Sequence, residues 1–338
     1  MHDKIKYYII TLINITVKQL IVRKACLFIC LFIILAMVQC RKGPVEARWE
    51  TFTSENGLAN NQVSGIAIDS RGTKWIASGL RMISGYNDET WTTFPIPDEY
   101  VCGFIFDIEV DDDNNKWIGT MGSGAVKFDG VTWTSYNKSN GFPCDDVLSL
   151  AIDEDGNMWF GTRNGVVRFD GDDWITFTEA DGLVSDTITA IAEDPDGTMW
   201  FGSVSGDVSK FDGTTWSNFS RPAGPTKHII NDIAADPDGN VWFATVYGAL
   251  RYNGVGWKLF YEPDGLLFYA VNVVTVDLQG NKWFGTGEGL SVYDGTNWTN
   301  YTETDGLVGN QVSCIAVEPD GIAWIGSPQF GISRLSFE

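Results

Sequence analysis

The residues of this chain that could carry out acid–base catalysis are few. It has two histidines, and His228 is the one outside the first 40 residues. His228 with Glu288 could act as acid and base, and paired acids such as Asp145 and Asp186 could serve a glycosidase or bind calcium. No nucleophile motif or metal-ligand spacing accompanies them. We therefore predict no catalytic residue, metal or cofactor, with calcium and a lyase or hydrolase activity as open alternatives.

A larger group of polar and aromatic residues is suited to binding. They stand eight residues before a recurring acidic turn, or just after a recurring tryptophan-containing strand. Carboxylates, amides, phenols and cations in such a ring can hold a small polar ligand by hydrogen bonds and ring stacking. The predicted ligand-binding residues are Asn61, Asp145, Asp186, His228, Tyr269, Asn310, Arg81, Arg163, Tyr247 and Glu288. Replacing both aspartates of this set together with His228 and Tyr269 is predicted to abolish binding and leave thermal stability nearly unchanged.

The spacing of the tryptophans indicates which elements position these residues. All 14 tryptophans fall into two series with steps of 41 or 42 residues. A period of this length is typical of the four-stranded blades of a β-propeller. The first series is Trp75, Trp117, Trp159, Trp200, Trp242, Trp283 and Trp324. The second series is Trp49, Trp91, Trp133, Trp174, Trp216, Trp257 and Trp298.

One repeat unit, residues 147–177, shows four strands separated by turn signals. Asp-Gly pairs and an Asp-Glu-Asp-Gly segment predict its tight turns. The four predicted strands are Val147–Ile152, Met158–Thr162, Val166–Phe169 and Trp174–Phe177. No segment of residues 47–338 has helical periodicity, so the predicted fold class is all-β.

The fourth strand of the unit, Trp-x-x-(Phe/Tyr), occurs six times after a unit and once before any unit, at Trp49–Phe52. The last unit, ending at residue 338, has no such strand after it. We therefore predict a seven-bladed β-propeller over residues 47–338, in which the N-terminal strand completes the last blade. Closing the ring in this way removes exposed sheet edges.

Residues present in every unit are predicted to be structural. The tryptophans are expected to pack between blades. Acids in the first turn are expected to cap that turn, and a Ser/Thr ring is expected to hydrogen-bond within or between blades. The acids are Asp69, Asp111, Asp153, Asp194, Asp236, Asp277 and Glu318. The hydroxyl residues are Ser78, Thr120, Thr162, Ser203, Thr245, Thr286 and Ser327.

A short motif before several units carries a family resemblance. It reads Asn56-Gly57-Leu58, Asp181-Gly182-Leu183, Asp264-Gly265-Leu266 and Asp305-Gly306-Leu307. Followed by a strand and Asp-x-x-Gly-x-x-Trp, it resembles the two-component regulator propeller repeats of periplasmic bacterial sensors. The resemblance implies a propeller and a sensory role. The chain has no kinase or DNA-binding domain, so we expect signalling to pass through a partner. Streptogramin-type lyases are similar in architecture and use histidine and glutamate with a metal, which is why His228 and Glu288 stay an alternative.

The first 40 residues differ in composition from the rest. Lys18, Arg23 and Lys24 precede an apolar run, Ala25–Val38, that is typical of a signal peptide. Its end at Cys40 resembles a lipoprotein signal, so Cys40 is a predicted lipidation site, with simple cleavage and an uncleaved anchor as alternatives. Residues 41–46 are a predicted linker. We expect a protein exported to the periplasm or cell envelope, touching membrane only through such an anchor.

Charge and cysteine content narrow the partners. The formal charge is −21 overall and −25 after residue 40, which disfavours nucleic acid as a partner. Cys102 and Cys144 share a repeat position and could form a disulfide, whereas Cys314 is expected in the core. We expect a monomer.

The leading functional hypothesis is a sensory propeller that binds a small molecule or glycan, or a signalling protein. A scaffold for proteins is a further alternative, which predicts an exposed apolar patch at Phe104, Phe142, Phe268 and Phe330.

Overall fold

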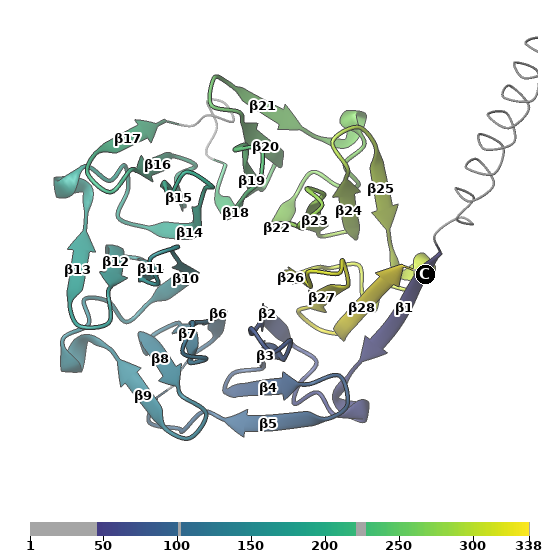
Figure 1. Cartoon of the computed structure of the whole chain (residues 1–338), viewed down its shortest axis with the longest axis horizontal. Coiled ribbons are helices and arrows are strands. Elements are labelled where there is room, and N and C mark those ends of the chain that lie inside the picture. The colour runs from purple at the N-terminus through teal and green to yellow at the C-terminus, as the bar shows by residue number, and fades with distance from the viewer. Residues whose placement is uncertain (1–45, 101–102, 221–227, 338) are drawn as a thin grey trace, which may run out of the picture. The chain divides into compact units, whose positions relative to one another are not determined.

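Seven four-stranded antiparallel sheets form a ring in the computed structural model, which describes residues 46–100, 103–220 and 228–337. The sheets lie like blades around a common centre, as Figure 1 shows, and a cavity lies along their inner strands. The propeller spans Ala47–Phe337. The predicted all-β class, the blade number and the strand number per blade are confirmed.

Each blade runs from an inner strand at the channel to an outer strand at the rim. Blade 1 contains β2 (Val63–Ile68), β3 (Lys74–Ser78), β4 (Met82–Tyr86) and β5 (Trp91–Pro95). Blade 2 contains β6 (Ile105–Val110), β7 (Lys116–Thr120), β8 (Ala125–Phe128) and β9 (Trp133–Tyr136). Blade 3 contains β10 (Val147–Ile152), β11 (Met158–Thr162), β12 (Gly165–Phe169) and β13 (Trp174–Phe177). Blade 4 contains β14 (Ile188–Glu193), β15 (Met199–Ser203), β16 (Val208–Phe211) and β17 (Trp216–Phe219).

The remaining blades follow the same order. Blade 5 contains β18 (Ile230–Ala235), β19 (Val241–Thr245), β20 (Gly248–Tyr252) and β21 (Trp257–Phe260). Blade 6 contains β22 (Val271–Val276), β23 (Lys282–Thr286), β24 (Leu290–Tyr293) and β25 (Trp298–Tyr301). Blade 7 contains β26 (Cys314–Val317), β27 (Ala323–Ser327), β28 (Gly331–Phe337) and β1 (Ala47–Phe52).

The ring closes through β1, which pairs antiparallel with β28 over its whole length. In Figure 1 the purple β1 and the yellow β28 lie side by side. An ion pair between Arg334 and Glu50, with Nη1 and Oε2 3.1 Å apart, joins the same strands. The prediction that the N-terminal strand completes the last blade is confirmed.

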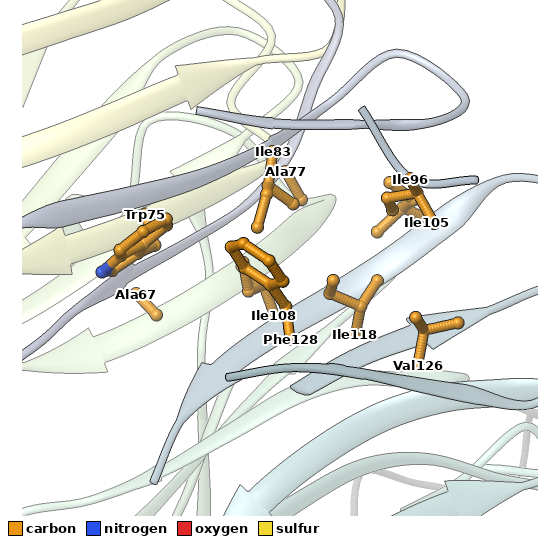
Figure 2. Packing of buried hydrophobic residues seen from close by; sticks show 10 residues of the cluster. All are labelled: Ala67, Trp75, Ala77, Ile83, Ile96, Ile105, Ile108, Ile118, Val126 and Phe128. Carbon is orange, nitrogen blue, oxygen red and sulfur yellow. The ribbon is translucent and has the colours of Figure 1, made fainter. Parts of the chain in front are cut away.

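The hydrophobic core lies between blades. Figure 2 shows one cluster, in which Ala67 and Trp75 of blade 1 face Ile108, Ile118 and Phe128 of blade 2. A further cluster of this kind fills each of the other six junctions. An indole of about 150–250 Å² contributes several kcal/mol when buried, at roughly 25 cal/mol per Å². The packing role predicted for the tryptophans is confirmed.

Each first-series tryptophan also donates a hydrogen bond to the turn acid six residues before it. The seven Nε1–oxygen distances lie between 2.7 and 3.0 Å. In blade 3 the same carboxylate, Asp153, accepts the backbone N–H of Asn157 at 2.8 Å. The turn acid therefore closes its turn and satisfies a buried indole N–H, which confirms the predicted capping role.

The hydroxyl ring acts within the blades. In five blades its Ser or Thr donates to a backbone carbonyl at the start of the third strand or in the loop just before it, at 2.8–2.9 Å. Ser78 differs, because its Oγ has no hydrogen-bond partner among the described residues. The predicted role is confirmed in most blades.

The Asp-Gly-Leu motif forms the entrance to a blade. Glu179–Asp181 is a short 3-10 helix, and Gly182 ends it with φ +115°. A Cβ on Gly182 would lie 3.1 Å from the Trp216 side chain, and Leu183 is buried. The other four such helices are Ser54–Asn56, Lys138–Asn140, Glu262–Asp264 and Glu303–Asp305. Sequence patterns missed them because three residues are too few to show a helical period.

Candidate functional site

The two faces of the ring differ in their connections. The loops that enter each inner strand and those between second and third strands share one face, which we call the variable face. The tight turns between first and second and between third and fourth strands form the opposite face, which we call the turn face. All ten predicted ligand-binding residues belong to loops of the variable face.

Four of these residues hold their own loops together. The side-chain oxygens of Asn61, Asp145, Asp186 and Asn310 each accept the N–H of the first residue of the preceding 3-10 helix, at 2.7–2.9 Å. The donor always lies seven residues earlier in the chain. Because these oxygens stabilise the entrance loops, replacing both aspartates should lower stability, contrary to the expectation drawn from the sequence. Binding of a ligand by these four residues stays a prediction.

The two arginines of the predicted set form ion pairs. Arg163 Nε lies 3.1 Å from Asp146 Oδ2, and Arg81 pairs with Asp98. Both arginines remain about half-exposed. Glu288 is exposed, and its backbone N–H donates to Thr286 Oγ1 at 3.1 Å.

The remaining three residues come together on blades 5 and 6. The ring of His228, which precedes β18, lies 4.4 Å from that of Tyr247 in the β19–β20 loop, in an edge arrangement. Tyr247 lies 6.3 Å from Tyr269, which precedes β22, and Phe268 packs against Tyr269 at 4.3 Å. We call these four residues the aromatic cluster. Tyr247 is 51% and Tyr269 45% exposed, whereas His228 is 8% exposed.

The histidine of the aromatic cluster is uncharged. Burial lowers the pKa of the His228 imidazole, so it is uncharged at neutral pH. The cluster therefore presents two half-exposed phenol rings, one of which contacts a neutral imidazole. Such an arrangement can stack on a flat ligand face and hydrogen-bond through phenol hydroxyls.

Sequence reasoning missed three carboxyl groups in the central channel. A cavity of about 280 Å³ lies along the inner strands and is lined by Asp107, Glu109 and Asp232. The signal in the sequence was the presence of acids in inner strands that are mostly apolar, two in β6 and one in β18.

The two aspartates connect neighbouring blades. Asp107 accepts the N–H of Leu150 in blade 3 at 2.8 Å, and Asp232 accepts that of Val274 in blade 6 at 2.9 Å. Burial raises the pKa of Asp107 to about 6 and that of Asp232 to about 7. Burial, reinforced by the charge of Asp107, raises the pKa of Glu109 to about 8. These acids gain protons near neutral pH, and the aspartates have a structural role.

Metal and cysteine chemistry is limited in the described part of the chain. No group of three or more His, Cys, Asp or Glu there has a metal-binding arrangement. Cys144 and Cys314 are buried free thiols, and burial raises the pKa of Cys314 to about 12. Cys314 lies at the start of β26, in the core as predicted, whereas Cys102 falls outside the described residues.

The predicted signal segment and Cys40 also fall outside the described residues. Within those residues, no helix has the length and apolar character needed to cross a membrane.

Several solved structures are similar in fold to this chain. The chain resembles the extracellular domain of BT3049 from B. thetaiotaomicron, described as a hybrid two component system, with a TM-score of 0.74 and 21% identity over 85% of this chain and 40% of that one. It resembles a streptogramin B lyase, with a TM-score of 0.71 and 15% identity over 86% of this chain and 98% of that one.

A third similar structure is PorZ, a surface component of the type-IX secretion system of Porphyromonas gingivalis. Its TM-score is 0.66, with 21% identity over 84% of this chain and 47% of that one. This chain thus spans less than half of the BT3049 and PorZ chains. At these identities the likeness shows the fold. A comparison with curated proteins gives no match.

The sequence matches the family model described as two component regulator propeller at residues 141–164, 182–205 and 224–247. Each match covers the first two strands of a blade and ends just after the second one. Three repeat units of the chain therefore match this family model, and the structure shows a seven-bladed β-propeller.

Proposed function

We propose that this propeller is an exported sensory module that binds a small molecule or glycan on its variable face, at the aromatic cluster. The observation that carries the proposal is the exposure of Tyr247 and Tyr269 on neighbouring blades, with ring centroids 6.3 Å apart. Tyrosine offers a large contact area with few rotatable bonds, so little entropy is lost when a ligand orders it. Sugar rings and planar molecules present the flat faces that such side chains bind.

The sensory part of the proposal draws on the fold. Two-component regulator propeller repeats and the likeness to the extracellular domain of BT3049 support a signalling role. A bound ligand would be reported to a separate signalling protein. The signal-like first 40 residues support export, and Cys40 supports a lipid anchor.

The test is a binding screen of the full chain on a glycan array and, by thermal shift, against small molecules. The double variant Tyr247→Ala/Tyr269→Ala should lose the ligands that the unchanged chain binds. Leu80→Ala is the matched control, because Leu80 is 50% exposed on the same face in blade 1. Ligand binding that survives the double variant would place the site elsewhere.

A protein-scaffold role is favoured by a different observation on the same face. Phe330, Leu80 and Phe104, on the successive blades 7, 1 and 2, are 48%, 50% and 61% exposed. Phe142, expected in such a patch, is buried against Phe160 and Trp174, and Phe268 is half-buried. If this surface docks a signalling protein, Phe104→Ser/Phe330→Ser should weaken that complex and leave ligand binding at the aromatic cluster unchanged.

A further inference from the structure

A pocket of about 460 Å³ lies on the turn face between blades 6 and 7. The buried indole of Trp283 forms its floor, and Tyr301 and Phe337 form aromatic walls. Among the described residues that line it are three carboxylates, those of Asp277, Asp294 and Asp320, and no lysine or arginine.

The other blades show which group normally occupies this position. In each of them a lysine or arginine lies over the first-series indole, with its charged group within 6 Å of the ring centroid. The shortest distances are Lys116 to Trp75 4.0 Å, Lys127 to Trp117 4.9 Å, Arg168 to Trp159 5.8 Å, Lys210 to Trp200 5.5 Å, Lys282 to Trp242 5.6 Å and Lys74 to Trp324 5.0 Å. Across the described ranges, Trp283 is the one indole of the series with no such cation.

Two repeat positions supply these cations, and both are apolar here. One is the third-strand residue opposite the indole, which is Lys127 beside Trp117 and Val292 beside Trp283. The other precedes the indole of the next blade. Lys282 stands there in blade 6, whereas Ala323 stands there in blade 7.

The junction of blades 2 and 3 gives a direct comparison. There Lys127 lines two smaller pockets, of about 410 and 350 Å³. Most of the residues equivalent to their linings surround the single larger pocket beside Val292. The pocket between blades 6 and 7 therefore has valine where the junction of blades 2 and 3 has lysine, and none of its described lining residues is a lysine or arginine.

The carboxylates of the pocket could bind a positively charged group. In blade 5, Asp236 Oδ2 lies 3.3 Å from Lys282 Nζ. Its equivalent Asp277 accepts hydrogen bonds from Trp283 and its own turn, with no cation beside it in the described structure. Backbone N–H groups of Asn297 and Thr296 lower the pKa of Asp294, which is therefore ionised at neutral pH. Ammonium groups bind well where aromatic rings and carboxylates meet.

We propose that this pocket binds a primary alkylammonium group, which takes the place over Trp283 that a lysine side chain takes in other blades. The alkyl chain would lie along Val292 and Phe337, with the ammonium group toward the carboxylates. A free amine and a lysine side chain of a peptide share this chemistry.

Titration of the full chain with n-butylammonium, which reproduces the lysine side chain, tests the proposal. We expect saturable binding followed by NMR shifts of the Trp283 indole, and no such binding of n-butanol at equal concentration. Val292→Lys supplies an internal cation and should weaken binding at least about tenfold. This variant should fold, because lysine stands at the same position in blades 2 and 4. Val292→Leu is the control and should keep binding.

The converse variant should create a site. Lys127→Val opens the junction of blades 2 and 3 and should add a second butylammonium site. Equal binding of butanol, unchanged binding by Val292→Lys or no second site in Lys127→Val would each overturn the proposal. An amide-blocked lysine that binds more tightly than butylammonium would point to a peptide source, and weaker binding to a free amine. Because Tyr247 and Tyr269 lie on the opposite face, their replacement should leave this binding unchanged.

Discussion

Trp49 lies opposite Leu335 in the β1–β28 pair, so the first tryptophan of the chain belongs to the last blade. Its indole also contacts the entrance of that blade, because a Cβ on Gly306 would lie 2.6–2.8 Å from the Trp49 side chain. Ring closure thus depends on backbone pairing and on side-chain packing at the same place.

Gly306→Ala should therefore destabilise the propeller. The added methyl group collides with Trp49, and alanine is strained at the φ of +122°. We expect the free energy of unfolding to fall by about 2–4 kcal/mol, measured by urea denaturation. Gly295→Ala is the control, since it has φ +99° and open space around its Cβ position, so it should show the strain alone. Equal effects of the two variants would argue against the Trp49 contact.

The turn acids should matter most through the indole. Asp153→Ala removes the acceptor of Trp159 Nε1 and of the Asn157 N–H, leaving a buried donor unpaired. The expected loss is about 2–3 kcal/mol of unfolding free energy. Asp172→Ala, an exposed acid on the same face, should change stability by less than about 0.5 kcal/mol. A loss no larger than that of Asp172→Ala would show that the indole bond is unimportant.

The channel acids predict a pH dependence. The pKa of Glu109 is about 8 in the folded protein against 4.5 for a free glutamate. A raised pKa means that the folded state binds the proton more tightly, so this contribution is complete below about pH 4.5 and is lost as the pH rises to about 8. Glu109→Gln removes this titration. The variant should therefore become more stable than the parent as the pH rises, by its free energy of unfolding.

The gain of Glu109→Gln should be on the order of 1–3 kcal/mol at pH 9 and near zero at pH 4, because the channel keeps the carboxyl partly solvated. Urea denaturation at several pH values measures it. Glu99→Gln, an exposed site, should follow the parent at every pH. A constant difference between Glu109→Gln and the parent would contradict the assignment.

A variant in an entrance loop and a variant in the aromatic cluster should affect different properties, stability in the first case and ligand binding in the second. Asp145→Ala removes the acceptor for the Lys138 N–H and should lower the unfolding free energy by about 1 kcal/mol. Tyr269→Ala, on an exposed side chain of the aromatic cluster, should leave stability nearly unchanged and weaken ligand binding. Thermal unfolding with and without ligand measures both. If Asp145→Ala instead weakened binding and Tyr269→Ala instead lowered stability, Asp145 would be a ligand-binding residue and Tyr269 a structural one.

Much of the architecture could be predicted because the same pattern of strands and turns occurs seven times in the sequence. Strand limits agreed to within a residue in the unit at 147–177, where Gly165 extends the third strand. In the last blade the apolar run of the sequence begins at Val312, two residues before β26 starts at Cys314. The grouping of His228, Tyr247 and Tyr269 was less visible, since it joins loops of two blades.

The blade count, the order of strands and the closure by Trp49–Phe52 follow from the amino-acid order alone, because a periodic chain repeats the same local choices and leaves one strand over. The roles of the non-repeating residues depend instead on how each loop folds and on how the blades meet in space. Asp145 and Asp186 have the chemistry of ligand-binding groups, yet their oxygens face backbone N–H groups of their own loops. Valine at position 292 is an ordinary strand residue in the sequence. Only the residues that surround it in the folded chain show that it lines a pocket, and that a lysine side chain is missing there. The contacts around Val292 depend on distances between blades 6 and 7, which no spacing along the chain encodes.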